Sequence, residues 1–389
     1  MAQHPVEMLD LNRDLSSEQR MIKDVVAQFV SSRISPNISE WFERESLPAR
    51  ELALEMGELG LLGMHLEGYD CAGTDALSYG LACVELEAAD SGIRSLVSVQ
   101  GSLAMFAIHA FGSEEQKQQW LPAMARGEMI GCFGLTEADF GSNPSGMRTT
   151  ARRDGSDWVL DGTKMWITNG TIADVAIVWA RTDAGIQGFL VPTDSPGFSA
   201  NLIHHKLSLR ASLTAELVLN NVRLPASAAL PGAIGLKAAL SCLNEARFGI
   251  VFGVVGAARN CLETAIEYSM SRVQFDRPIA GFQLTQAKLA DMSTRLQTSY
   301  LLALHLAKLK DAHVLRPEQI SVGKFNNAAA ALDIARESRS ILGGSGISLE
   351  YPVIRHMANL ESVVTYEGTH EIHTLVIGEA LTGLSAYRG

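Results

Sequence analysis

The apolar positions in the first third of the chain recur every three or four residues, the spacing of one helix face. Ser16 and Gln19 form a capping-box pair just before the run from Met21 to Val30. Further periodic segments, separated by turns that contain glycine or proline, cover residues 52–62, 79–86 and 96–111. We therefore expect the N-terminal part of the chain to be helical.

From about Cys132 the pattern changes to short β-prone runs between turn residues. Asp154-Gly155 and Asp161-Gly162 are turn dipeptides on either side of one such run, and Asn169-Gly170 is a third. The other β-prone runs, interspersed with prolines, lie at residues 175–179, 188–191 and 216–219. This middle region is expected to be a compact β-domain.

Helical spacing returns after about Leu240. Between Pro278 and Pro317 no glycine follows Gly281, and one helix face is apolar at Leu289, Met292, Leu296, Ala303 and Leu306. A second long helix is expected from Glu318 to Leu342. The pattern predicts an α+β protein with three domains: helical, β and helical, at residues 1–131, 132–240 and 241–389.

Composition narrows the classes of function. The 389 residues are 47% hydrophobic and 19% charged, and the net charge is −11. No basic cluster is present, which argues against a nucleic-acid partner. We expect no membrane segment, because no apolar run approaches the length needed to cross a bilayer, and residues 1–10 resemble neither a secretory signal nor a transit peptide. The five cysteines are odd in number without a C-x-x-C pair, so a cytoplasmic location is the simplest expectation.

Several familiar site motifs are absent or incomplete. Gly344-Ser345-Gly346 lacks the third glycine of a dinucleotide fingerprint, and it follows a helix rather than a strand. His370-Glu371-Ile372-His373 is one residue short of H-E-x-x-H, so its histidines would not share a zinc-binding face. Neither a G-x-S-x-G elbow nor a P-loop occurs, and we expect no metal site.

The segment Thr365–Thr369 offers a candidate general base. Glu367 stands between an aromatic residue and Gly368, whose small size permits close approach of a ligand. An apolar enclosure would raise the pKa of Glu367 into the range of a useful base. The alternative is that Glu367 is a solvated loop residue and Thr369 merely caps the next helix.

Two further segments, 132–144 and 164–169, combine hydroxyls, backbone N–H groups and an aromatic side chain in a glycine-rich setting. Such segments suit a flat heteroaromatic cofactor, although ordinary β-domain turns with a buried Trp would look the same. Arg272, Phe275 and Arg277 could hold phosphate groups, or they could form a solvated helix end.

Taken together, these segments resemble the acyl-CoA dehydrogenase family, in one order from about Leu15 to Ala386. The stretches that carry the resemblance are CFGLTEADFGSNPSGMRT, GTKMWITNG, SCLNEARFGIVFG, SRVQFDRPIAGFQLTQAKLADM, ILGGSGIS and TYEGTHEIHTL. Within the family, residues 90–103, 207–212 and 359–373 are most similar to glutaryl-CoA dehydrogenases. Departures from the family pattern occur at residues 69–73, Asn143, Lys237-Ala238-Ala239 and Ser345.

The resemblance implies a helical domain, a β-domain and a C-terminal four-helix bundle, assembled as a homotetramer with non-covalent FAD. It implies that the isoalloxazine and ribityl chain contact Phe133, Leu135, Thr136, Gly141, Ser142, Trp166, Ile167 and Thr168. Arg272, Phe275 and Gln283 would meet the FAD phosphates or adenine, and Thr369 and Glu371 would close over the flavin. A neighbouring subunit would supply Ser340, Ile341, Leu342, Gly343 and Gly344.

The resemblance also implies the chemistry. Glu367 would remove the α-proton of a CoA thioester, and its backbone N–H would stabilise the enolate oxygen. Further substrate contacts are expected from Glu87, Arg94, Ser95, Ser98, Ser142, Leu243, Asn244, Arg247, Tyr366 and Gly368. Arg94, with Glu87 and Ser98, would hold a distal carboxylate; alternatively, Arg94 only pairs with Glu87 in a polar network.

The expected function is therefore FAD-dependent α,β-dehydrogenation of a short dicarboxylyl-CoA, with glutaryl-CoA oxidised and decarboxylated to crotonyl-CoA. Electron-transfer flavoprotein is the expected electron acceptor. One alternative is a dehydrogenase of a short or branched saturated acyl group, on CoA or a carrier protein, without decarboxylation. Another is a cofactor-free relative that acts as a scaffold.

Overall fold

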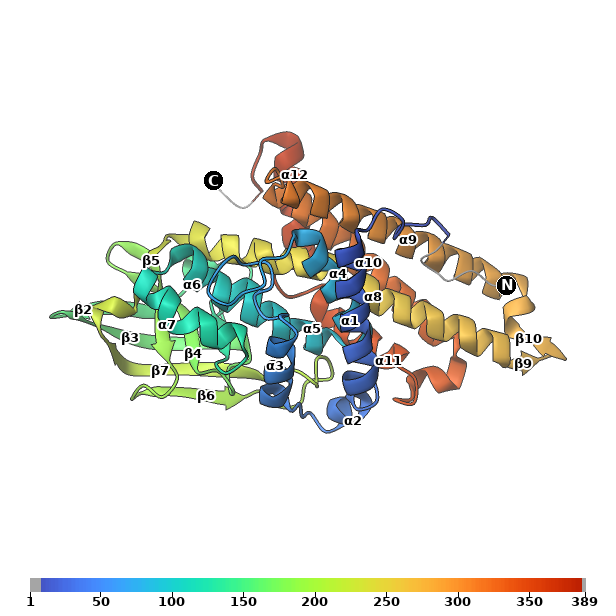
Figure 1. Cartoon of the computed structure of the whole chain (residues 1–389), viewed down its shortest axis with the longest axis horizontal. Helices are drawn as coiled ribbons and strands as arrows, with labels where there is room; N and C mark the ends of the chain where they lie inside the picture. Colours follow the sequence, from blue (N-terminus) through green and yellow to red (C-terminus); the bar gives the residue numbers. More distant parts are fainter. Residues whose placement is uncertain (1–7, 387–389) are drawn as a thin grey trace.

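The computed structural model describes residues 8–386 and extends along one axis, with strands at one end and long helices at the other (Figure 1). The predicted capping box is confirmed, because Ser16 and Gln19 each accept a backbone N–H of the other at the start of α1. The N-terminal helices are α1 (Ser17–Phe29), α2 (Ile38–Glu43), α3 (Ala49–Glu58), α4 (Ala76–Ala89), α5 (Ser91–Ser98), α6 (Phe106–Phe111) and α7 (Glu114–Ala125).

The middle region is an eight-stranded sheet in the order β6-β7-β3-β2-β4-β5-β8, with β1 pairing in parallel with β4. Its strands are β1 (Gly131–Gly134), β2 (Thr150–Asp154), β3 (Asp157–Thr168), β4 (Val175–Thr182), β5 (Gly185–Pro192), β6 (Phe198–Leu202), β7 (Thr214–Leu224) and β8 (Ala229–Ile234). The prediction of a turn at Asp161-Gly162 is wrong. β3 continues through it with a bulge, because β2 and β7 pair with it on both sides. Gly162 passes so close to Thr149 that a Cβ would lie 2.5 Å from its Oγ1, so the position requires glycine.

The C-terminal helices are α8 (Leu236–Ser271), α9 (Gln283–Asp311), α10 (Pro317–Ile341), α11 (Val353–Val363) and α12 (His370–Thr382). Both long helices expected here are confirmed as α9 and α10. The short hairpin β9 (Val273–Gln274) and β10 (Arg277–Pro278) joins α8 to α9 at the end of the molecule farthest from the large sheet (Figure 1).

Helix α8 corrects one expectation, because it is long and apolar enough to cross a bilayer by length and composition alone. In the folded protein, 67% of the most apolar 18-residue stretch of α8 is buried. Helices α4 and α10 pack along it. At the crossing with α4, a Cβ on Gly256 would lie 1.8 Å from the carbonyl oxygen of Val84, so only glycine allows this close approach.

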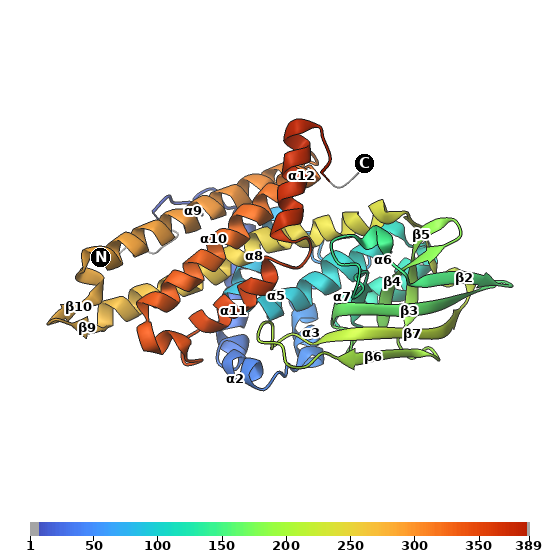
Figure 2. The same ribbon diagram turned by 180° about the vertical axis from the view of Figure 1, so that it is seen from behind.

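The three regions meet around α11, which packs against α5 (Figure 2). Asp90 at the start of α5 accepts hydrogen bonds from Arg355 (2.7 Å) and Asn359 (2.8 Å) of α11. Asn359 in turn accepts the backbone N–H of Leu209, in the loop between β6 and β7, at 2.7 Å. Since α11 leads directly into residues 365–369, these contacts fix the candidate base relative to both other regions.

Candidate active site

Residues 365–369 form a tight turn between α11 and α12, which we call the base turn. Glu367 and Gly368 adopt the left-handed backbone region, with φ of 52° and 95°. A Cβ on Gly368 would lie 3.0 Å from Nε2 of His373 and 3.3 Å from Nη2 of Arg247, so this turn requires glycine. Thr369 caps α12 by accepting the N–H of Ile372, which is the part of the alternative interpretation that holds.

The carboxylate of Glu367 is held inside the molecule rather than in solvent. Its Oε2 is fully enclosed and has no hydrogen-bond partner among residues 8–386. Burial raises the pKa of Glu367, and the nearby cations Arg94, Arg247 and Lys324 oppose that rise. An enclosed, unpaired carboxylate of raised pKa has the properties of a general base, which argues against the solvated-loop alternative.

Arg94 lies beside the base turn and joins two of the expected substrate residues. Its Nε donates to Glu87 at 2.7 Å, and its Nη2 donates to the hydroxyl of Tyr366. Arg94 and Glu87 have side chains that are 1% and 0% exposed. Burial would lower the pKa of Arg94, but Glu87 and Tyr366 raise it well above its usual value. Arg94 therefore carries a permanent positive charge in the interior.

The pair with Glu87 does not use all the donors around Arg94. Within the described part of the chain, Nη1 of Arg94 forms no hydrogen bond. The buried hydroxyls of Ser95 and Ser98 make no hydrogen bond of normal geometry, although they lie near the hydroxyls of Tyr366 and Tyr79. Buried donors normally have partners. Three unpaired donors in one place are therefore available to a ligand that carries several acceptors.

Asn244 and Arg247 approach the base turn from α8. The Nε of Arg247 donates to the carbonyl oxygen of Glu367 at 2.7 Å, and its Nη1 donates to Oδ1 of Asn244 at 3.1 Å. Leu243 is half-buried on the same helix. Expected residues from α4, α5 and α8 thus lie around the base turn. Arg94 and Arg247 are hydrogen-bonded to it directly, and Glu87 and Asn244 are linked to it through them.

Sequence reasoning missed two side chains at this turn. Lys324 of α10 donates to the carbonyl oxygens of Tyr366 and Gly368. His373 packs against Gly368, and burial together with Lys324 and Arg247 lowers its pKa to about 3, so it stays neutral. The signal for Lys324 was its position on the apolar face of its helix, four residues after Ile320 and seven before Ala331.

The two segments expected to hold a heteroaromatic cofactor lie together on the β-domain. The backbone N–H of Met165 donates to the carbonyl of Thr136 at 2.8 Å, which joins β3 to the segment after β1. Beneath them, buried Lys164 pairs with Glu137 at 2.8 Å and also donates to the carbonyl of Leu135. Trp166 is not buried as the alternative required. It is 57% exposed, with φ of 64°.

Around this exposed ring, the expected contacts have mixed environments. Phe133, Leu135 and Ile167 are buried, Thr136 and Thr168 are half-buried, and Gly141 and Ser142 are exposed. A Cβ on Gly141 would meet no atom within 4 Å. The β-domain therefore exposes one aromatic ring, Trp166, on segments that also carry accessible backbone and hydroxyl groups. Glu371, in the first turn of α12, is an exposed residue.

The remaining expected cofactor contacts lie far from Trp166 within one chain. Arg272 ends α8, Phe275 forms the tip of the β9-β10 hairpin, and Gln283 begins α9, at the end of the molecule opposite the sheet (Figure 1). Residues 340–344 share this end, since Lys288 of α9 donates to Ser340 at 3.1 Å. Within one chain, neither the set Arg272, Phe275 and Gln283 nor residues 340–344 reaches the β-domain. Only residues 340–344 had been expected to come from a neighbouring subunit.

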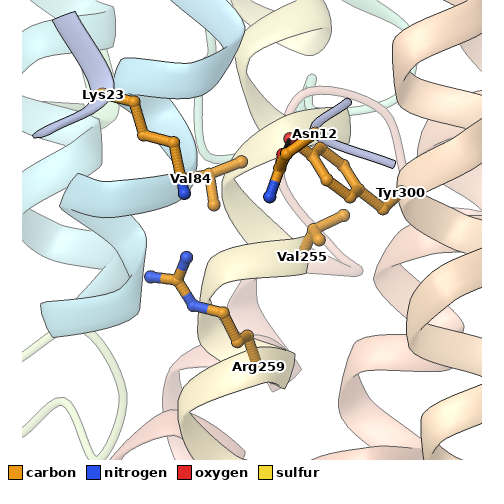
Figure 3. Close-up of a pocket in the computed structure, with 6 residues that line it drawn as sticks. All are labelled: Asn12, Lys23, Val84, Val255, Arg259 and Tyr300. Atoms are coloured by element: carbon orange, nitrogen blue, oxygen red, sulfur yellow. Dashed lines mark hydrogen bonds between the residues drawn. The ribbon is translucent and has the colours of Figure 1, made fainter. Parts of the chain in front are cut away.

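A small cavity lies elsewhere, between the N-terminal segment, α1, α4, α8 and α9 (Figure 3). Asn12, Lys23, Val84, Val255, Arg259 and Tyr300 surround it. Three of its four polar side chains have partners: Arg259 pairs with Glu85 at 2.6 Å, and Tyr300 donates to Asn12 at 2.8 Å. Residues 8–386 contain no group of three His, Cys, Asp or Glu side chains that could hold a metal ion.

Comparison with known proteins decides the family. Residues 16–128, 132–222 and 234–382 match the models of the N-terminal, middle and C-terminal domains of acyl-CoA dehydrogenases. The chain belongs to the acyl-CoA dehydrogenase family. The expected α+β fold, with a helical, a β and a helical domain, is confirmed for this acyl-CoA dehydrogenase.

Several relatives are similar along nearly their whole length. A crystal structure of glutaryl-CoA dehydrogenase from Mycobacterium smegmatis is 66% identical, with a TM-score of 0.99 over 100% of both chains, and a second structure of such an enzyme contains FADH2. Butyryl-CoA dehydrogenase from Megasphaera elsdenii is 34% identical, with a TM-score of 0.91, over 95% of this chain and 99% of its own. The short-chain specific mitochondrial enzyme of Bos taurus is 36% identical over 96% of this chain and 92% of its own.

Proposed function

We propose that this protein is an FAD-dependent acyl-CoA dehydrogenase that oxidises and decarboxylates glutaryl-CoA to crotonyl-CoA. The observation that carries the proposal is the enclosed, unpaired carboxylate of Glu367 beside a buried Arg94 whose surroundings keep three unpaired donors. The 66% identical glutaryl-CoA dehydrogenase, which forms a complex with FADH2, supports both the cofactor and the substrate class.

The residues of the β-domain fit a flavin. The exposed ring of Trp166 gives an apolar face for the isoalloxazine, and the open backbone at Gly141 leaves room beside it. Hydroxyls of Thr136, Ser142 and Thr168 lie on the segments that border this face, where they would hold the polar ring edge and the ribityl chain. Bound FAD supplies the hydride acceptor, which the protein's own side chains cannot.

Glu367 performs the proton transfer. Its carboxylate takes the α-proton of the thioester as a hydride leaves the β-carbon, which gives a 2,3-enoyl thioester and a protonated Glu367. The developing negative charge falls on the thioester oxygen, which the N–H of Glu367 can stabilise because the base turn leaves it free of protein acceptors. Arg247 and Asn244 place α8 beside this position, where CoA would pass.

Arg94 selects a substrate with a distal carboxylate. A buried arginine without a counter-charge is costly, yet Glu87 already neutralises Arg94 and leaves Nη1 available. A carboxylate can accept from Nη1 and from the hydroxyls of Ser95 and Ser98 in the same place. A wholly apolar acyl chain would leave these three donors unpaired, and each would then cost binding free energy.

Decarboxylation follows from the same arrangement. After dehydrogenation, the bond between the γ-carbon and the carboxylate breaks, carbon dioxide leaves, and its electron pair forms a dienolate on the thioester. Protonated Glu367 then returns its proton to the γ-carbon, which yields crotonyl-CoA and restores the base. Tyr366 donates no proton in this sequence, because burial, Glu87 and Glu367 raise its pKa to about 12, although Arg94 opposes the rise.

The assembly we propose is a homotetramer, in which the β9-β10 end of one subunit reaches the flavin of another. Phe275 and Leu284, at that end, are 89% and 83% exposed, which suits contacts with a second copy. Electron-transfer flavoprotein is proposed as the electron acceptor. The cytoplasm is proposed as the location, and no nucleic-acid or membrane partner is proposed.

Anaerobic mixing with a panel of acyl-CoA thioesters tests this function. Glutaryl-CoA should bleach the flavin absorbance of the yellow holoenzyme, with release of carbon dioxide and crotonyl-CoA. Bleaching by butyryl-CoA but not by glutaryl-CoA would refute the substrate and favour a saturated acyl-CoA. Bleaching by glutaryl-CoA without carbon dioxide would refute only the decarboxylation. A colourless protein that takes up no FAD would refute the enzyme class.

A further inference from the structure

We propose that Lys324 is a positioning residue that holds the base turn from both sides of Glu367, and so aims both its carboxylate and its backbone N–H. The inference rests on the proposed function, since it concerns the residue that removes the α-proton. It adds a role for a side chain of α10 that neither the sequence motifs nor the assigned substrate contacts include.

The contacts of Lys324 are unusual for a lysine. Its side chain is only 1% exposed, and its ammonium donates to the carbonyl oxygens of Tyr366 and Gly368, the residues on either side of Glu367. Arg247 donates to the carbonyl of Glu367 itself at 2.7 Å. Buried Lys324 and half-buried Arg247 thus donate to three consecutive carbonyls, and every peptide oxygen of residues 366–368 is held in place.

This arrangement determines the direction of the Glu367 N–H. In a trans peptide the carbonyl of one residue points opposite to the N–H of the next, and the described chain contains no cis peptide bond. Because Lys324 holds the Tyr366 carbonyl, the N–H of Glu367 must point away from α10. No hydrogen bond from that N–H occurs within residues 8–386. Lys324 therefore keeps free the donor that the thioester oxygen needs.

The charge of Lys324 acts on the same carboxylate. Burial lowers the pKa of Lys324 and raises that of Glu367, and each group opposes the shift of the other. The other groups facing Glu367 are Arg94 from α5, Arg247 from α8, neutral His373 from α12 and un-ionised Tyr366. Without Lys324, the pKa of Glu367 would rise further, and less of the base would be ionised at a given pH.

A purely structural role for Lys324 would be to tie α10 to the base turn and nothing more. Replacement by methionine, which has similar length but neither charge nor donors, would then reduce folding stability and FAD content without changing how flavin reduction depends on pH. A positioning role predicts a different result, because the geometry and the ionisation of Glu367 both change while the rest of the site stays intact.

The test compares holoenzymes of wild type, Lys324→Met and Lys324→Arg in anaerobic stopped-flow reduction across pH, with whichever acyl-CoA bleaches the wild type most rapidly. Lys324→Met should reduce the flavin about a hundredfold more slowly. The acidic limb of its pH–rate profile should move to higher pH, and its FAD content should be unchanged. Lys324→Arg changes the geometry but keeps the charge. Its rate of flavin reduction should therefore fall, while the acidic limb of its pH–rate profile stays in place. The control Arg295→Met removes the exposed α9–α10 pair with Asp333 and should match wild type.

Wild-type rates in both Lys324 variants, or equal losses in both with no movement of the limb, would overturn the inference. If Lys324→Met does not fold, Lys324→Arg decides: a wild-type rate would overturn the role. A second readout does not depend on activity. Hydrogen exchange of the amides of residues 365–370 should be faster in either Lys324 variant than in wild type. Unchanged exchange would refute the positioning role of Lys324 even if no acyl-CoA bleached the protein.

Discussion

The guanidinium of Arg94 donates to the hydroxyl of Tyr366, the residue that directly precedes Glu367. The side chain that we assign to the distal end of the substrate is therefore bonded to the turn that carries the base. Their separation sets the length of acyl chain that can present its α-carbon to Glu367 while its far end reaches Arg94. This geometry favours a short dicarboxylyl chain over a long one.

Replacement of Arg94 by glutamine should affect glutaryl-CoA far more than butyryl-CoA. The variant loses the charge that meets the distal carboxylate. We expect kcat/KM for glutaryl-CoA to fall roughly a hundredfold, which corresponds to a loss of about 3 kcal/mol of transition-state binding free energy, as for a buried hydrogen-bonded charge. Butyryl-CoA has no such carboxylate. The measurement is flavin reduction by each thioester, and equal losses would remove Arg94 from substrate recognition.

That variant also leaves Glu87 buried without its partner, which costs stability by itself. Arg259→Gln is a matched control, because Arg259 forms another largely buried pair, with Glu85 at 2.6 Å, on helices α8 and α4. It should lower the melting temperature as Arg94→Gln does, but it should leave the ratio of the two substrates unchanged.

Replacement of Glu367 by glutamine should abolish reduction while preserving the fold. The amide keeps the shape of the side chain but cannot accept the α-proton, so the rate of flavin reduction should fall by about three orders of magnitude or more. FAD content and melting temperature should stay near wild type, because the Oε2 replaced has no hydrogen-bond partner among the described residues. Rapid bleaching of the variant by glutaryl-CoA would contradict the assignment of the base.

The sequence was sufficient for local features and insufficient for contacts between distant segments. The capping box at Ser16 and the glycine-free run of α9 depend on neighbouring residues, and both are confirmed. The turn assigned to Asp161-Gly162 failed because β3 is paired on both sides, and that pairing outweighs a turn dipeptide. Periodicity alone likewise could not tell that α8 would be covered by α4 and α10.

The residues of the candidate site likewise fall into those that neighbouring positions reveal and those that depend on the packing of distant segments. Glu367 and Gly368 were recognised from adjacent residues, whereas Lys324 lies 43 positions earlier and reaches the turn only through the packing of α10 on α12. The grouping of Arg272 with residues 340–344 at one end of the bundle could not be derived from spacing either. It depends on how α9 and α10 run side by side, which the contact between Lys288 and Ser340 shows.

The ion pair of Glu137 and Lys164 should make stability depend on pH. Burial would raise the pKa of Glu137, but the N–H of Arg148, Lys164 and Thr149 together lower it from 4.5 to about 2. A depressed pKa stabilises the fold above the unfolded value, so this contribution is complete above pH 4.5 and is lost as pH falls toward 2.

Glu137→Gln should therefore unfold at lower urea concentration than wild type at pH 7, and the difference should narrow as the pH falls below 4.5. The control Asp154→Asn removes an exposed pair with Arg223 and should cost little at either pH. A difference between wild type and Glu137→Gln that stays constant down to pH 3 would show that Glu137 contributes through shape rather than charge.

Removal of the Trp166 ring should weaken FAD binding without weakening the fold. The ring is 57% exposed, so Trp166→Ala gives up little buried area in the apoprotein and should change its melting temperature only slightly. In the holoenzyme the same ring would cover the flavin, and its loss should raise the FAD dissociation constant about tenfold or more, as for loss of an aromatic contact of 1.5 kcal/mol. Ile234→Ala, which removes another exposed apolar side chain of the β-domain, should leave FAD binding unchanged. Equal FAD affinity in wild type and Trp166→Ala would place the flavin elsewhere and would separate the β-domain segments from the cofactor.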